Sequence, residues 1–141
     1  MNRAFVLDSS VALSWCFEDQ QTDLSEAALH ELQHGGTGLV PSLWAIEVAN
    51  VLVRAVRQKI LSQDRADEFV QLLLGLPLQV KSTPRERALR DVRSLATKAK
   101  LSAYDATYLE LAARLGARMA TLDEGLRKAA GRAGVGLLGQ H

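Results

Sequence analysis

The sequence contains a single cysteine, Cys16, in 141 residues. One thiol cannot form an internal disulfide or a zinc site with several cysteine ligands. The simplest expectation is therefore a protein of a reducing, cytoplasmic environment. Because 48% of the residues are hydrophobic and 23% are charged, the chain can bury a core without cross-links, and we expect one domain over residues 1–141.

Long hydrophobic runs and an excess of one charge are also missing. The apolar N-terminal stretch is interrupted by Asp8 and is not followed by a small-residue cleavage site. We therefore expect neither a signal peptide nor a membrane span, and no membrane partner. The net charge is only +1. Such a chain does not coat nucleic acid by bulk electrostatics, so any binding of this kind has to be local.

Aromatic residues are scarce, at 5% of the chain. We interpret four of them as core or dimer contacts rather than as platforms for base stacking: Trp15, Trp44, Tyr104 and Tyr108. Histidine supplies no evident general base. His30 and His34 have the i, i+4 spacing of a metal-binding pair, but the glycines that follow favour a solvated helix end.

Short apolar segments alternate with longer amphipathic ones along the chain. Strands are predicted near residues 5–7, 38–40, 76–80 and 117–123, with a short fifth near 135–138. Helices are predicted near residues 11–18, 24–33, 43–59, 62–74, 84–99, 101–115 and 124–133. This order predicts an α/β fold, a three-layer sandwich related to the Rossmann fold, with a parallel sheet of short strands.

Four acids are predicted to lie at the carboxyl edge of that sheet, where open parallel sheets bind ligands. Asp8 directly follows the first strand, and Asp123 follows the fourth. Glu47 lies in the first turns of the helix after the second strand, and Asp105 lies in the first turn of its own helix. Each acid also has a plain interpretation as a helix cap or first-turn acid. In particular, Ser102 and Asp105 resemble a capping box.

A cluster of four carboxylates requires a cation, because like charges repel and burial penalises every ionised form. Oxygen ligands without nearby histidine or cysteine favour Mg²⁺ or Mn²⁺. Such an ion shares its shell with phosphate oxygens and activates a water molecule. The acids therefore point to hydrolysis of a phosphodiester.

Four separated blocks of the chain carry a resemblance to a known family. They are LDSS at residues 7–10, WAIEVANVL at 44–52, LSAYDATYLELAARLGARMATLD at 101–123 and EGLRKAA at 124–130. In this order, and over the full length of the chain, they resemble PIN-domain ribonucleases. The likeness is greatest to the VapC-type toxins of bacterial toxin–antitoxin pairs.

The resemblance implies a PIN-like fold in which four acids bind Mg²⁺ or Mn²⁺ and form the catalytic site: Asp8, Glu47, Asp105 and Asp123. It implies that three polar residues support these ligands from outside: Ser10, Asn50 and Thr121. It also implies endonucleolytic cleavage of RNA, a homodimer, and a small VapB-like antitoxin whose C-terminal segment lies along the active-site groove.

Six basic residues precede the helix of Asp105 and are candidates for holding a phosphate backbone: Arg85, Arg87, Arg90, Arg93, Lys98 and Lys100. Because Glu86 and Asp91 are interleaved with them, we interpret most of these residues as a solvated helix face.

Three other functions stay open. An aspartate-based phosphotransferase would use Asp8 as a covalent nucleophile, although Ser10 replaces the second acid expected two residues later. A receiver-like signalling module would need an aspartate after the third strand, where this chain has Lys81 and Ser82. A non-catalytic module that binds a metal ion or a basic partner is also compatible with the four acids.

Overall fold

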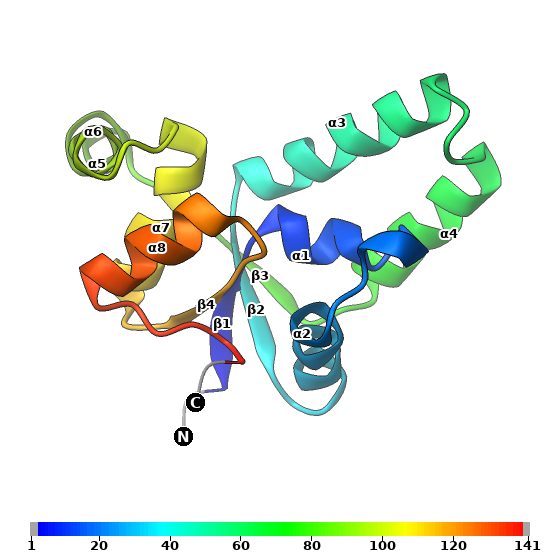
Figure 1. Ribbon diagram of the computed structural model, residues 1–141, viewed down its shortest axis with the longest axis horizontal. Coiled ribbons are helices and arrows are strands. Elements are labelled where there is room, and N and C mark those ends of the chain that lie inside the picture. The colour runs from blue at the N-terminus through cyan, green and yellow to red at the C-terminus, as the bar shows by residue number, and fades with distance from the viewer. Residues whose placement is uncertain (1–2, 140–141) are drawn as a thin grey trace.

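The centre of the protein is a four-stranded parallel sheet (Figure 1). The structure is a computed structural model, and it describes residues 3–139. The strands are β1 (Ala4–Leu7), β2 (Thr37–Pro41), β3 (Leu78–Lys81) and β4 (Arg118–Ala120), in the order β3-β2-β1-β4. Val6 of β1 pairs with Leu39 of β2 and with Met119 of β4. All four predicted strands are present, and β1 is fully buried from Phe5 to Leu7, as in a sheet covered on both faces.

Two groups of helices cover the two faces of the sheet (Figure 1). The chain runs from β1 through β2 to β3 on one face, with α1 (Ser9–Ser14), α2 (Asp23–Gln33), α3 (Leu43–Arg57) and α4 (Gln63–Leu74). It returns to β4 on the other face, with α5 (Arg85–Arg87), the π-helical turn η2 (Ala88–Val92), α6 (Arg93–Ala99) and α7 (Ala103–Leu115). The last helix, α8 (Glu124–Ala133), packs beside α7. The predicted three-layer α/β sandwich is confirmed.

The carboxyl ends of β1 and β4 lie where the chain leaves the sheet toward opposite faces. The chain after β1 enters α1 on one face, and the chain after β4 enters α8 on the other (Figure 1). In open parallel sheets, ligands bind in the crevice between two such diverging loops. This topology places Asp8 and Thr121, which directly follow the two strands, at the candidate site.

Helix α7 is the most deeply buried helix of the fold, with seven consecutive buried residues at 106–112. It begins at a Ser102 cap, whose Oγ accepts the backbone N–H of Asp105 at 3.1 Å. It ends at Gly116, which has the left-handed backbone conformation that glycine adopts without strain. Because α7 contacts β1, β2 and β4, its first turn, which carries Asp105, has a fixed position.

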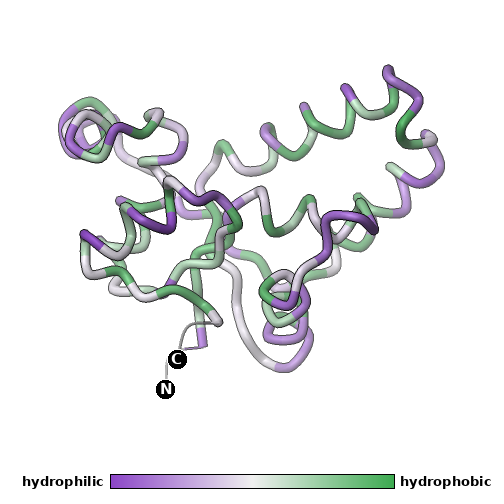
Figure 2. Tube along the Cα trace, viewed as in Figure 1, coloured by the Kyte–Doolittle hydropathy of each residue, from purple (hydrophilic) through white to green (hydrophobic). Residues whose placement is uncertain are grey.

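The other helices bury one face each, as their sequence pattern predicts. In α3 the buried residues are Trp44, Val48, Leu52 and Ala55, at the spacing of one side of a helix. Figure 2 shows hydrophobic residues along the strands and hydrophilic residues on the outer turns of α2, α4, α5 and α6. No helix within residues 3–139 is long and apolar enough to cross a membrane.

Three predicted elements differ from the structure. The helix expected at 11–18 ends at Ser14, whose hydroxyl donates to the Val11 carbonyl at 2.6 Å and so competes with the helical pattern. A short 3₁₀ turn, η1 (Glu18–Gln20), follows. The helix expected at 84–99 is interrupted by the π-helical turn η2. The expected fifth strand is reduced to one parallel bridge between Met119 and Leu137, because the flanking glycines weaken an extended segment.

Candidate functional site

Asp8 is the buried centre of the candidate site. It directly follows β1, and its backbone N–H donates to the Ala120 carbonyl at 3.0 Å, which ties it to the end of β4. Its residue surface is only 4% exposed. Two hydroxyls donate to the same carboxylate oxygen, Oδ2, from Ser10 at 2.6 Å and from Thr121 at 2.7 Å. Asp8 is at the N-cap of α1 but makes no side-chain capping bond, so the helix-cap interpretation is wrong for this acid.

The protons of these two hydroxyls have a defined direction. The Ser10 Oγ accepts the backbone N–H of Leu122 at 3.1 Å, and the Thr121 Oγ1 accepts the backbone N–H of Asp123 at 3.1 Å. Since a hydroxyl has one proton, each gives it to Oδ2 of Asp8. This arrangement binds the loop after β1 to the loop after β4 and leaves Oδ1 as the oxygen available to a ligand.

The pKa of Asp8 is raised above its usual value. Burial is the main cause, and the nearby charges of Glu47 and Asp123 add to it. The hydrogen bonds from Ser10 and Thr121 oppose the increase because they stabilise the ionised form. A buried carboxylate of this kind is expensive to keep ionised unless a cation is present.

Asp105 lies in the first turn of α7, as predicted. Its pKa is also raised, first by burial and then by the negative charges of Asp123 and Asp8, while a hydrogen bond with Ser102 lowers it. The Ser102 hydroxyl caps the helix through the Asp105 N–H. The same turn therefore carries both the helix cap, from Ser102, and the candidate site residue Asp105.

Glu47 is held in place by Tyr108, which sequence reasoning assigned only to a core or a dimer contact. The phenol of Tyr108 donates a short hydrogen bond to Oε1 of Glu47, across 61 positions of sequence. Tyr108 is fully buried. Burial and the Glu47 carboxylate raise the pKa of its phenol well above the usual range, so it remains a donor. The only local signal was its place three residues after Asp105 on the same face of α7.

Asp123 combines two roles that the sequence presented as alternatives. It is the N-cap of α8, and its Oδ1 accepts the backbone N–H of Leu126 at 2.8 Å. It is exposed to solvent, and its charge acts on both Asp8 and Asp105. The interpretation as a helix cap is therefore correct, and it leaves the second carboxylate oxygen for the site.

Two further polar residues complete the surroundings. Asn50 lies exposed on α3, one turn after Glu47, and its supporting role stays a prediction. Arg127, which sequence reasoning missed, donates from its guanidinium to the Thr121 carbonyl at 3.0 Å. It thereby fixes the loop whose hydroxyl holds Asp8. His30 and His34 lie at the C-terminal end of α2, where their rings stack on each other at 4.0 Å.

The four predicted acids come from four separate elements and act on one another at the carboxyl edge. Asp8 experiences the charges of Glu47 and Asp123, and Asp105 experiences those of Asp123 and Asp8. Within residues 3–139, however, no three or more His, Cys, Asp or Glu side chains are arranged closely enough to hold a metal ion together. An open set of carboxylate oxygens fits Mg²⁺, which keeps several waters and takes only one or two carboxylates directly. The donor set is therefore compatible with a hard divalent ion.

A cleft of about 680 Å³ begins beside this cluster. Ser10 and Leu122 line it at the end near the acids. From there it extends between α1, η1 and α3, where Leu13, Phe17 and Val51 line it together with Arg54. None of the four acids lines this mainly apolar cleft, and Ser10, whose hydroxyl donates to Asp8, connects the cleft with the acids.

Comparison with known proteins identifies the family. A profile of the PIN domain matches residues 5–132. The chain is 30% identical to Ribonuclease VapC3 of Pyrobaculum aerophilum over 121 residues, which cover 86% of this chain and 90% of that protein.

Two crystal structures share the fold. The first, of PAE2754 from Pyrobaculum aerophilum, has a TM-score of 0.62 and 19% identity, and the match covers 89% of this chain and 84% of that one. The second, of VapBC2 from Rickettsia felis bound to a promoter DNA fragment, has a TM-score of 0.67 and 12% identity, with coverage of 95% and 96%. With its profile match, its curated relative and its four acids at the sheet edge, the chain belongs to the PIN-domain family.

Proposed function

We propose that this protein is an endoribonuclease that hydrolyses RNA phosphodiester bonds with Mg²⁺ or Mn²⁺. The observation that carries the proposal is the buried carboxylate of Asp8, fixed through Oδ2 by two hydroxyls and surrounded by three acids from other elements. A relative that is named a ribonuclease supports RNA as the substrate.

Each acid has a distinct role in this proposal. Asp8 and Asp105 would hold the ion directly, because burial raises the pKa of both and an ionised carboxylate there needs a cation. Glu47 and Asp123 complete the site or act through water. The bound ion would supply an activated water and charge stabilisation for the leaving oxygen.

The surrounding residues hold these acids in position. Ser10 and Thr121 keep Asp8 in one orientation, and Tyr108 does the same for Glu47. Arg127 holds the Thr121 backbone. Preorganised carboxylates do not have to reorient during the reaction, which lowers the cost of reaching the transition state.

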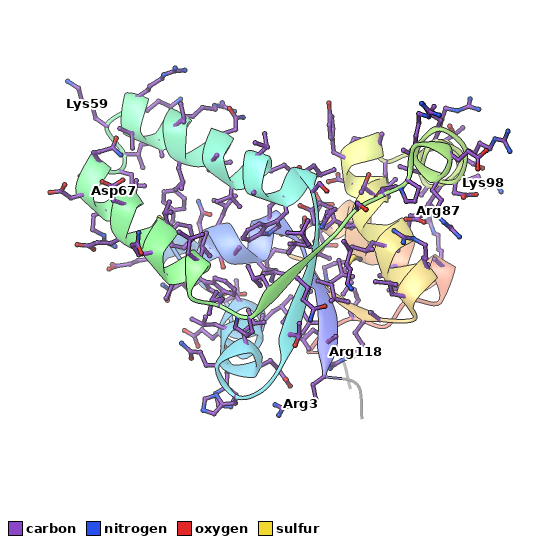
Figure 3. All side chains as sticks on the ribbon, turned by 180° about the vertical axis from the view of Figure 1, so that it is seen from behind. Arg3, Lys59, Asp67, Arg87, Lys98 and Arg118 are labelled. Carbon is purple, nitrogen blue, oxygen red and sulfur yellow. The ribbon has the colours of Figure 1, made fainter. Side chains whose placement is uncertain are left out.

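The test is cleavage of a structured RNA by the purified protein in Mg²⁺ or Mn²⁺. Asp8→Asn and Asp105→Asn should each reduce the rate by about a hundredfold or more, because each removes a direct ligand charge from the ion. Asp67→Asn is the matched control, since this exposed acid lies on α4 at the far end of the α3–α4 hairpin (Figure 3).

Wild-type rates in Asp8→Asn or Asp105→Asn would refute the assignment. If the wild-type protein binds the ion but does not cleave RNA under any metal condition, a non-catalytic binding module becomes the better description. A phosphotransferase has less support, because Ser10 occupies the position of the second acid and its hydroxyl is engaged by Asp8.

We also propose that the protein acts in the cytoplasm as a homodimer controlled by a small VapB-like antitoxin. The apolar cleft that begins at Ser10 is a suitable groove for a segment of such a partner, and one structural relative is a VapBC2 assembly. Ile46 and Tyr104 are 72% and 66% exposed, which supports a contact between two copies. A monomeric mass in light scattering at micromolar concentration would contradict the dimer.

A further inference from the structure

Residues 85–100, which comprise α5, η2, α6 and the residue after it, form a segment that we call the basic arm. The arm has six basic and two acidic residues, a net charge of +4, so the remaining 125 residues of the +1 chain together carry −3. Without this segment the chain would therefore be net negative.

Most cations of the basic arm are unpaired. Arg85, Arg90, Lys98 and Lys100 are exposed, and none of them has a salt-bridge partner among residues 3–139. Arg87 pairs with Asp91 at 3.6 Å and with Glu110 at 3.2 Å, and Arg93 donates from Nε to the Leu89 carbonyl at 2.8 Å. The six cations are exposed, as expected for a solvated helix face, but those four have no acidic partner in the described part of the chain that would neutralise their charge.

The basic arm is anchored rather than loosely attached. Glu110 of α7 is only 6% exposed, and its Oε1 accepts hydrogen bonds from Arg87 at 3.2 Å and from Arg114 at 2.9 Å. Val92, in the middle of the arm, is buried. These contacts fix the arm on α7, the same helix whose first turn carries Asp105.

The basic arm lies at the same edge of the sheet as the four acids. Figure 3 labels Arg87 and Lys98 on the arm, at the carboxyl edge of the sheet, whereas Arg3 and Arg118 lie near the opposite edge. The arm ends at Lys100, whose left-handed backbone turns the chain into the Ser102 cap of α7. Lys98 and Lys100 of the arm are therefore only seven and five positions before Asp105.

We propose that the basic arm binds the phosphate backbone of the RNA and guides it to the site of Asp8 and Asp105. This inference rests on the proposed nuclease function, because that function makes a polyanionic chain the molecule that enters a negatively charged site. Arginine and lysine contacts to phosphates give affinity without reading sequence. We therefore assign the basic arm to an RNA backbone. An acidic polypeptide has no phosphodiester bond that the neighbouring site could hydrolyse.

The test measures binding of a short, labelled, single-stranded RNA in EDTA, where binding is separated from cleavage. The variant Arg85→Gln/Arg90→Gln/Lys98→Gln should bind at least about tenfold more weakly, and the slope of log affinity against log salt should fall by about 2, at about 0.7 for each contact. The control variant Arg118→Gln/Arg132→Gln removes exposed charges elsewhere and should bind like wild type. Arg85→Lys/Arg90→Lys keeps the charge that neutralises phosphates and should also bind normally.

Equal affinity and salt slope in wild type and the triple glutamine variant would overturn the proposal, provided that both proteins have the same circular dichroism spectrum. So would polyglutamate that competes as well as RNA, because that result would assign the arm to an acidic protein. Loss of cleavage in Asp8→Asn with unchanged RNA binding in EDTA would support the proposal that the arm binds RNA and that a separate site cleaves it. If wild type binds RNA through the arm but never cleaves it, the proposed nuclease function is wrong, whereas the assignment of RNA binding to the arm is correct.

Discussion

Asp8 is a carboxylate in a position that favours its neutral form. Burial raises its pKa, and Glu47 and Asp123 raise it further. Ser10 and Thr121 oppose this increase in pKa by donating hydrogen bonds to Oδ2. These two bonds replace part of the hydration that the carboxylate loses on burial. Buried ionisable residues with a shifted pKa are common at functional sites. Such residues make the folded protein less stable than it would be with other side chains at the same positions.

Asp8→Asn should make the metal-free protein more stable at neutral pH, although it abolishes the proposed activity. A carboxyl with a folded pKa above its unfolded value of 3.8 contributes stability below that pH and loses it as the pH rises through the raised pKa. The asparagine carbonyl still accepts both hydroxyls and never ionises. Thermal unfolding in EDTA should give a melting temperature several degrees above wild type at neutral pH, with the difference vanishing below pH 3.8.

The control Asp67→Asn should change the melting temperature little, because this side chain is exposed on α4 and its hydrogen bond from Gln63 also lies at the surface. A wild-type protein that is equally stable or more stable than Asp8→Asn at neutral pH would show that the Asp8 charge is not penalised in the fold.

At the scale of elements, helix α7 connects the core to the site. Its middle is buried against three strands, while its first turn presents Asp105 at the sheet edge. One hydroxyl cap, from Ser102, determines where the helix begins. Another helix, α4, begins with a cap of the same geometry, in which the Ser62 Oγ accepts the backbone N–H of Arg65 at 3.1 Å. The two caps therefore form a natural pair for separating stability from function.

Ser102→Ala and Ser62→Ala should each lower the free energy of unfolding by about 1 kcal/mol, the usual cost of losing a serine cap. Only Ser102→Ala should also weaken binding of Mn²⁺, because fraying of the first turn of α7 displaces Asp105. Denaturant unfolding and calorimetric metal titration measure the two effects. If both variants bind the ion like wild type, the cap does not position the site.

The local features of this site were predictable from the sequence, and the distant contacts were not. Asp8 and Asp105 were placed correctly because a strand end and a helix start have signals within a few residues. The bond from Tyr108 to Glu47 spans 61 positions, and the contact of Arg87 with Glu110 spans 23. Such pairs depend on how the helices pack, which periodicity does not reveal. The π-helical turn at 88–92 was missed because its sequence is ordinary amphipathic helix.

Across the whole molecule, the acidic cluster and the basic arm are two distinct charged regions. The acids of the sheet edge come from four elements, whereas residues 85–100 form one continuous segment with a net charge of +4. One region is suited to a divalent ion and the other to a polyanion. A net charge of +1 therefore conceals two strong local fields of opposite sign.

Millimolar Mg²⁺ or Mn²⁺ should raise the melting temperature of the metal-free wild-type protein, because the ion binds only the folded arrangement of acids. At an ion concentration about a hundred times the dissociation constant the gain is about 2.7 kcal/mol, several degrees for a domain of this size. Asp8→Asn and Asp105→Asn should show little shift, and Asp67→Asn should respond like wild type. A wild-type protein that does not respond to either ion would argue against a metal site.

The hydrogen bond from Thr121 to Asp8 joins residues that are 113 positions apart. During synthesis, Asp8 leaves the ribosome long before Thr121 has been translated. The carboxylate therefore has no fixed orientation, and β1 has no β4 beside it, until almost the whole chain has emerged. Incomplete chains that end before Thr121 lack the assembled site, so the proposed nuclease activity would arise only late in the synthesis of this domain.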